Sequence, residues 1–146
     1  MKILVASAIL LFLFFNNSYS QNDDQEQILS QRELSNQALW GVDRELNNTL
    51  MTDEVLITTG AGTLLSGKSA LKEYIYNAKG PKMYWIRTPD EVLVNSQTQL
   101  TWERGTWKGY EENSDEAVVG GKYSAQWTKA SGAWLIQSQW FVALEN

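Results

Sequence analysis

The sequence of 146 residues contains no cysteine and no histidine. Without cysteine the chain forms no disulfide, so its hydrophobic core alone must stabilise the fold. Without histidine, Ser-His-Asp and Cys-His catalysis, histidine metal ligation and the usual pH-switch residue are all excluded. Asp, Glu, Tyr and Lys are the acid-base groups that remain, and we predict neither a metal site nor a bound cofactor.

Positive charge is also scarce, with 12 Lys and Arg against 17 Asp and Glu. The basic residues form no cluster along the chain. Nucleic acids and anionic membrane surfaces are bound by basic patches, so an acidic chain of this kind is poorly suited to either. We therefore expect no nucleic-acid partner.

The first twenty residues have the pattern of a secretory signal peptide. Lys2 precedes the apolar run Ile3 to Phe15, and Ser18-Tyr19-Ser20 offers small residues where a signal peptidase cleaves. The rival interpretation is an uncleaved membrane anchor, but a span needs about 20 apolar residues and this run is shorter. We predict residues 1–20 as the signal peptide and 21–146 as one exported domain, periplasmic or secreted, with no membrane attachment after cleavage.

One short stretch matches a nucleotide-binding motif. Residues 62–69 read GTLLSGKS and fit the phosphate-binding P-loop pattern, between a predicted strand and a predicted helix. A P-loop domain needs a parallel sheet with alternating helices, whereas the residues after Ala78 predict antiparallel strands. We therefore interpret Gly62 to Ser69 as a turn and a helix start, with Ser66 as the cap, and expect no nucleotide to bind.

Hydrophobic periodicity predicts two helices, a strand, a third helix and then a meander of about four strands. The predicted helices span 28–40, 44–50 and 68–78, and the predicted strands span 55–59, 83–88, 92–95 and 98–108. Residues 122–144 are two alternating runs around Ser131-Gly132, typical of an antiparallel β-hairpin with a broad aromatic face. This order predicts an α+β fold in which helices cover one face of a curved antiparallel sheet and leave a conical cavity.

The first predicted helix, residues 28–40, has a broad and weak apolar stripe. Trp40 ends it and is either a lid on the cone or a packing residue. Gly41 then stops the helix, and Asp43 is suited to cap the next one. The apolar members of the stripe are Ile28, Leu29, Leu34, Ala38 and Leu39.

Several segments resemble, in order, the SnoaL-like domains and the domain-of-unknown-function family 4440 of the nuclear transport factor 2-like superfamily. Residues 38–55 are similar to the opening of a SnoaL-like domain, and Gly67-Lys68 with Ala70-Leu71 resembles its turn into the second main helix. The residues that resemble the 4440 pattern are Trp85-Ile86-Arg87, Gly105-Thr106-Trp107, Gly121-Lys122-Tyr123, Trp127, Lys129, Gly132, Trp134 and Ile136.

The resemblance implies a cone-shaped α+β fold, nuclear transport factor 2-like or cystatin-like, and a homodimer joined through the outer face of the sheet. It implies little about activity, because the superfamily includes ketosteroid isomerase, polyketide cyclases, dehydratases and non-catalytic binding domains. The acid-base set of the isomerases cannot be placed on this sequence residue by residue.

Side-chain alternation gives an independent prediction of the inner layer of the sheet. With Tyr123 and Trp127 facing inward, Arg87 and Glu103 belong to the same layer, and a bulge at Pro89 or Gly105 would turn part of it over. Such aromatic walls suit a small apolar or aromatic ligand, although tryptophans also fill cores and dimer interfaces. The predicted pocket residues are Trp40, Tyr84, Trp85, Trp107, Tyr123, Trp127 and Trp140.

Glu103 and Arg87 are the candidate catalytic residues. Buried charges are rarely left alone, so we expect the two to form a mutual hydrogen-bonded pair. Alternatively they orient a ligand, or Glu103 acts as a general base while Arg87 or a tyrosine stabilises an oxyanion.

Three functions remain open at this point, and the interior of the cone distinguishes them. Our leading hypothesis is an exported domain that binds a small molecule. A hollow cone with an unpaired Glu103 would favour an acid-base enzyme instead. A cone filled by side chains would favour a non-catalytic module that binds a partner.

Overall fold

The computed structural model describes residues 2–41 and 43–145, and side chains between residues 21 and 144 except residue 42. Its elements follow the predicted order, with two helices, a strand region, a third helix and then a meander of strands. They are α1 (Lys2–Trp40), α2 (Arg44–Thr49), β1 (Met51–Thr58), β2 (Leu64–Ser66), α3 (Gly67–Asn77), β3 (Met83–Asn95), β4 (Leu100–Glu111), β5 (Ala117–Thr128) and β6 (Leu135–Glu145).

The strands form one six-stranded sheet in the order β2-β1-β6-β5-β4-β3. Strands β3 to β6 pair antiparallel as successive hairpins, which confirms the predicted meander and the closing hairpin. The short strand β2 pairs antiparallel with β1, but β1 lies parallel to β6. The sheet is therefore mixed, because the chain passes through α3 before the meander brings β6 back beside β1.

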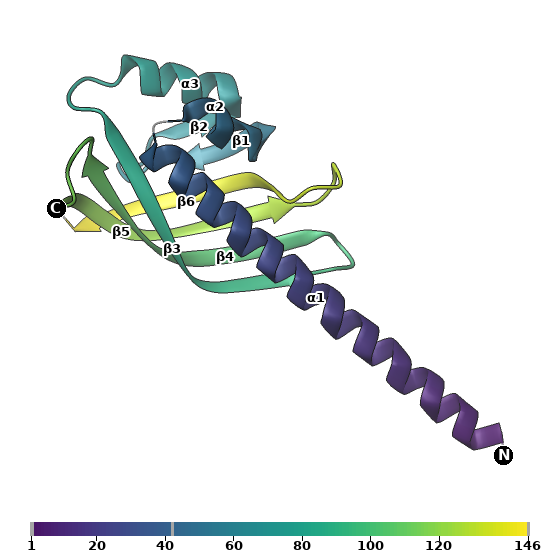
Figure 1. The fold of residues 1–146 in the computed structure, drawn as a ribbon. Coiled ribbons are helices and arrows are strands. Elements are labelled where there is room, and N and C mark those ends of the chain that lie inside the picture. The colour runs from purple at the N-terminus through teal and green to yellow at the C-terminus, as the bar shows by residue number, and fades with distance from the viewer. Residues whose placement is uncertain (1, 42, 146) are drawn as a thin grey trace.

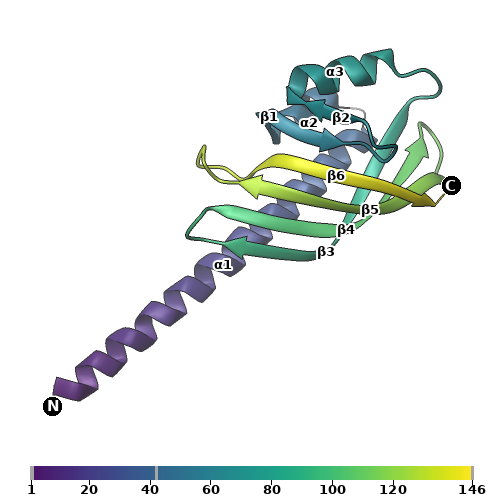
Figure 2. The same cartoon turned by 180° about the vertical axis from the view of Figure 1, so that it is seen from behind.

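All three helices lie on one side of the curved sheet (Figure 1). Seen from behind, the strands β3 to β6 present a face that no helix covers (Figure 2). We call the side toward the helices the inner face and the other side the outer face. The N-terminal part of α1 extends beyond the sheet (Figure 1). The side chains of the predicted signal peptide lie outside those described, and no helix in the described part of the chain is long and apolar enough to cross a membrane.

The inner face of the sheet packs against α1 to form the core. Trp127, Trp134 and Ile136 are among the largest completely buried side chains, together with Ile28 of α1. At roughly 2 kcal/mol for each large apolar side chain removed from water, such residues provide the main stabilisation of a fold without disulfides.

A bulge in β6 reverses the alternation of its side chains. Trp127 lies opposite Ile136, but Gln126 lies opposite Ser138, so Gln137 is an extra residue. As a result Ile136 points inward, whereas Trp140 points outward and is 61% exposed. The prediction that Trp140 lines the pocket is wrong for this reason.

A second bulge lies in β3, near the proline where the sequence analysis anticipated one. Pro89 lies opposite Gly105 and Glu91 lies opposite Arg104, so Asp90 is the extra residue. The bulge follows Arg87, which therefore keeps its predicted inward direction.

Helix α1 turns a largely polar face toward the sheet, contrary to the predicted apolar stripe. Ile28 and Ala38 are buried as expected, but Leu29 and Leu34 are exposed. Polar side chains of α1 find hydrogen-bond partners on the sheet, which compensates for their burial. The buried polar residues of this face are Asp24, Arg32, Ser35 and Asn36.

The segment that matches the P-loop pattern forms a tight turn and the strand β2. Thr59 and Thr63 close the turn through a backbone hydrogen bond of 2.9 Å, and Lys68 at the start of α3 pairs with Asp53 at 2.9 Å. Ser66 takes the predicted N-cap position, but its side chain makes no capping hydrogen bond. In α2 the predicted cap does form, since Asp43 accepts a hydrogen bond from the backbone N–H of Leu46 at 3.0 Å.

Candidate functional site

The predicted acid Glu103 lies at the centre of the cone and is 0% exposed. Arg32 of α1 donates to both of its oxygens, from Nε at 2.8 Å and from Nη2 at 3.0 Å. Tyr123 and Trp127 of β5 donate one further hydrogen bond each. We call Glu103, Arg32, Tyr123, Trp127 and Gln139 the Glu103 cluster; Gln139 joins it by accepting from Arg32 at 3.3 Å.

The position of Glu103 follows from the alternation of β4, which turns every second residue inward. Its ionic partner is Arg32, so the prediction of a mutual pair between Glu103 and Arg87 is wrong. The reason is that α1 lies over the sheet and places a guanidinium above Glu103. That guanidinium also lies 5.0 Å from the ring centroid of Trp127 and 5.5 Å from that of Tyr123, within cation–π range.

Electrostatics hold the cluster in one protonation state. Burial raises the pKa of Glu103, but the charge of Arg32 and the hydrogen bonds from Arg32, Tyr123 and Trp127 outweigh it and hold that pKa below its ordinary value. Burial, and then the negative charge of Glu103, raise the pKa of the Tyr123 hydroxyl, which therefore stays protonated as a donor. An ionised carboxylate has about four acceptor positions, and the four donors occupy them.

A second ion pair fixes α1 to the closing hairpin. Asp24 accepts hydrogen bonds from Lys129 at 2.7 Å and from the indole of Trp134 at 3.0 Å. Burial raises the pKa of Asp24, but these two hydrogen bonds and the charge of Lys129 lower it by more. Lys129 and Trp134 both donate to Asp24, so these three residues have a structural role in joining α1 to the hairpin.

Arg87, on β3, is 3% exposed and has a different environment. Its Nη1 donates to the backbone oxygen of Trp85 at 3.3 Å and its Nη2 donates to Ser35, while its Nε has no hydrogen-bond partner. Burial lowers the pKa of Arg87 well below its ordinary value, and the charge of Arg32 lowers it further. No carboxylate among the described residues pairs with it.

A cavity of about 40 Å³ lies near Arg87, where the three helices meet the first half of β3. Asn47 of α2 lines it and accepts a hydrogen bond from Ser35 at 2.6 Å, so one hydrogen-bonded pair connects the cavity to Arg87. We call this space the mouth cavity. Its other lining residues are Leu39, Arg44, Glu45, Asn48, Lys72, Ile75, Tyr76, Met83 and Trp85.

The predicted pocket residues are therefore dispersed. Trp85 lines the mouth cavity, whereas Tyr123 and Trp127 belong to the Glu103 cluster. Trp107 lies on the inner face opposite Arg87 and is buried in the same hydrophobic core as Trp127. It fills that core and lines no pocket, with its indole N–H 3.3 Å from the backbone oxygen of Val142 and its ring edge-on to Phe141.

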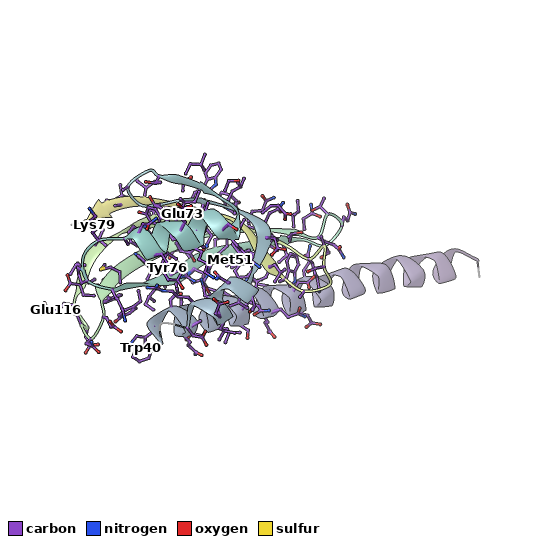
Figure 3. The ribbon with its side chains drawn as sticks, turned by 90° about the horizontal axis from the view of Figure 1, so that it is seen from above. Trp40, Met51, Glu73, Tyr76, Lys79 and Glu116 are labelled. Atoms are coloured by element: carbon purple, nitrogen blue, oxygen red, sulfur yellow. The ribbon has the colours of Figure 1, made fainter. Side chains whose placement is uncertain are left out.

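Two further predicted pocket residues lie away from the inner face. Tyr84 is stacked on Tyr110 and donates its hydroxyl to the backbone of Ser114 at 2.9 Å, because it alternates with Trp85 and so points to the opposite face. Trp40 is 66% exposed at the end of α1 and extends from the edge of the molecule (Figure 3). Neither contributes to a pocket inside the cone.

The residues that sequence reasoning missed are Arg32, Ser35, Asn36 and Asn47. The three on α1 could have been found from their spacing, since Asp24, Ile28, Arg32 and Asn36 recur every four residues on one helix face and Ser35 adjoins it. The apolar stripe was weak because this buried face is polar. Asn47, on α2, has no such signal in the sequence.

Solved structures with the same architecture give the fold its name. An NTF2-like protein with a cystatin-like fold from Novosphingobium aromaticivorans is 13% identical, with a TM-score of 0.69, over 97% of this chain and 88% of that one. A ketosteroid isomerase-like protein from Erwinia carotovora atroseptica is 15% identical, with a TM-score of 0.66, over 86% and 99%. The chain has the nuclear transport factor 2-like fold.

Other nuclear transport factor 2-like structures are similar at the same level. The CaMKII hub homology domain of Chlamydomonas reinhardtii is 15% identical, with a TM-score of 0.63, over 83% of this chain and 98% of that one. No family model matches the sequence, and no curated protein matches it. At these identities the likeness establishes the fold, and the function has to be argued from this chain's own residues.

Proposed function

We propose that the chain is an exported, non-catalytic binding module of the nuclear transport factor 2-like fold, which works as a dimer of two copies joined through the outer face of the sheet. The observation that supports it is an uncharged groove on that face, beside two exposed tryptophans. The proposal of export rests on the pattern of residues 1–20, and finding the protein in the cytoplasm with those residues retained would contradict it.

The state of Glu103 argues against the acid-base alternative. A general base needs a free lone pair within reach of a substrate proton. Arg32, Tyr123 and Trp127 occupy the acceptor positions of Glu103, and the filled interior gives it no exposed surface. Among the three hypotheses, a filled cone is the condition that favours partner binding.

The outer face has the composition of an interface. Trp102 on β4 and Trp140 on β6 lie opposite Gln126 and Ser124 of the strand between them. Monomeric proteins rarely expose a broad apolar patch, and tryptophan is enriched in the centres of protein interfaces. The exposed apolar residues of this face are Leu56, Leu93, Trp102, Trp140, Val142 and Leu144.

A groove of about 470 Å³, lined in part by both tryptophans, explains why a second copy suits this face. In a twofold arrangement the same patch meets itself, so a protruding tryptophan of one copy can enter the groove of the other. The chain carries a net charge of −5, so two copies repel each other weakly, and an uncharged contact surface adds no close like-charge pairs to that repulsion. The residues that line the groove are all uncharged: Leu93, Asn95, Thr98, Leu100, Thr101, Trp102, Ser124, Ala125, Gln126, Ser138 and Trp140.

Analytical ultracentrifugation of residues 21–146 tests the proposal. We expect a dimer at micromolar concentration, and monomers for Trp102→Arg and Trp140→Arg, because each places like charges at the centre of the contact. Trp40→Arg is the matched control, since it makes the same substitution at an exposed tryptophan away from the sheet. A wild-type monomer at 100 µM (roughly the limit for a weak but specific dimer) would refute the proposal, as would a monomer produced equally by Trp40→Arg.

A further inference from the structure

Arg87 differs from every other buried charge in the described part of the chain. Four charged side chains are buried there: Asp24, Arg32, Arg87 and Glu103. Arg32 and Glu103 pair with each other, and Asp24 pairs with Lys129. Arg87 alone has no ionic partner among the described residues.

The hydrogen bonds of Arg87 are also incomplete. A guanidinium carries five N–H donors in a planar fork, of which two have partners here, on Trp85 and Ser35, while Nε has none. A buried cation without a counter-charge and with an unused donor is unfavourable. An anion that reached Arg87 would remove that cost.

The mouth cavity provides the approach to Arg87. The hydrogen-bonded pair of Ser35 and Asn47 separates the cavity from the Arg87 guanidinium. Trp85 lines the cavity, and its backbone oxygen accepts a hydrogen bond from Arg87. A ligand oxygen could therefore replace Asn47 and Ser35 as the neighbour of the guanidinium after small rotations of two short side chains.

The electrostatics of the cavity favour a single negative charge. Arg44 of α2 and Lys72 of α3 line it, against one acidic residue, Glu45. With Arg87 behind Asn47, the local charge is positive in a chain that is acidic overall. Such a local field raises the concentration of small anions at the site.

The remaining lining residues are largely apolar, and they define the rest of the ligand. Leu39, Ile75 and Met83 with the ring of Trp85 surround the space, and Tyr76 lies on the side of α3 that faces α2 (Figure 3). A phosphate would gain nothing from the apolar walls. A carboxylate fits the planar fork of an arginine and can carry an apolar tail.

We propose that the mouth cavity binds a small monocarboxylate, whose carboxylate pairs with Arg87 and whose short apolar tail packs against Trp85 and Met83. A volume of about 40 Å³ excludes long chains, and a short one such as propionate enters when Ser35 and Asn47 rotate aside. The site lies on the helix side of the sheet, so this proposal does not depend on the proposed dimer.

Nuclear magnetic resonance of the wild-type domain, residues 21–146, tests the proposal without any variant. Propionate is titrated against ¹⁵N-labelled protein at constant ionic strength, with propionamide and sodium chloride as controls for shape and for anionic charge. We expect the Nε–H resonance of Arg87 to shift and saturate with propionate alone. Equal shifts with propionamide or chloride, or no saturating shift with propionate, would overturn the proposal.

Variants assign the binding to Arg87. We expect Arg87→Met to weaken propionate binding at least tenfold, whereas Lys79→Gln, which removes one positive charge from an exposed position outside the mouth cavity (Figure 3), should bind as the wild type does. Equal binding by Arg87→Met and wild type would refute the assignment. Propionate should also bind unchanged to Trp140→Arg, so a failure of the dimer proposal and a failure of this one give different results.

Discussion

Glu103 and Arg87 are buried charges on neighbouring strands of the inner face, but they differ in how many ionic and hydrogen-bond partners surround them. Glu103 has an ionic partner and four donors on its two oxygens. Arg87 has two hydrogen bonds, no ionic partner among the described residues and an unused Nε. Burial of a charge therefore does not by itself mark a functional site. A saturated group holds the fold together, whereas an unsaturated one retains the capacity to bind.

The largest effect is expected when the saturated group is broken. Glu103→Gln keeps the shape of the side chain but leaves Arg32 buried without a counter-charge. We expect the free energy of unfolding to fall by about 3–5 kcal/mol, the usual cost of breaking a buried pair by changing one partner. Urea denaturation followed by tryptophan fluorescence measures it.

The double variant Arg32→Met with Glu103→Leu is the control for that result. It removes both charges and keeps apolar volume, so we expect it to recover most of the lost stability, as replaced buried pairs often do. A double variant less stable than Glu103→Gln would contradict the view that the unpaired charge of Arg32 causes the loss of stability.

An intermediate effect is expected from acid. The pKa of Glu103 lies below its ordinary value of 4.5, so the folded state holds the proton less tightly than the unfolded state. The stability that Glu103 contributes is therefore complete above about pH 4.5 and is lost as the pH falls through the lower, folded pKa. Asp24 contributes in the same direction. A ¹³C titration of the Glu103 carboxyl carbon checks this, and a midpoint above 4.5 would contradict it.

The smallest effect is expected at the unsaturated group. Arg87→Met removes a cation that has no counter-charge and retains much of the side-chain volume. The relief of burying that cation should offset the two lost hydrogen bonds, so we expect the free energy of unfolding to change by less than about 1 kcal/mol. A loss as large as that of Glu103→Gln, in the same urea experiment, would remove the distinction between the two groups.

Sequence patterns predicted the parts of this fold that depend on local periodicity. The alternation of residues 122–144 is sufficient for the closing hairpin and for the inward direction of Trp127, because both follow from a period of two. Helix α3 ends within one residue of its predicted bounds for a similar reason, since its apolar face has helical spacing. The inward placement of Glu103 came from the same argument.

The partner of Glu103 could not be predicted in this way. Arg32 is 71 residues distant in sequence, and its position over Glu103 depends on how α1 lies across the sheet. The predicted direction of Trp140 was wrong for a different reason. One extra residue, Gln137, reverses the alternation of side chains, and no residue type in the sequence indicates this bulge. The parallel pairing of β1 with β6 also depends on tertiary structure, because each strand is equally regular in either direction.

The side-chain amide of Asn36 has a consequence for the exposed edge of the sheet. It donates to the backbone oxygen of Arg87 at 2.8 Å and accepts from the backbone N–H of Arg87 at 3.0 Å. Strand β3 is at the end of the sheet, where unpaired backbone groups can recruit a strand from another molecule. By occupying one donor and one acceptor midway along β3, Asn36 acts as a one-residue substitute for a neighbouring strand. Helix α1 therefore also shields the middle of this edge, in the folded protein, from pairing with a strand of another molecule.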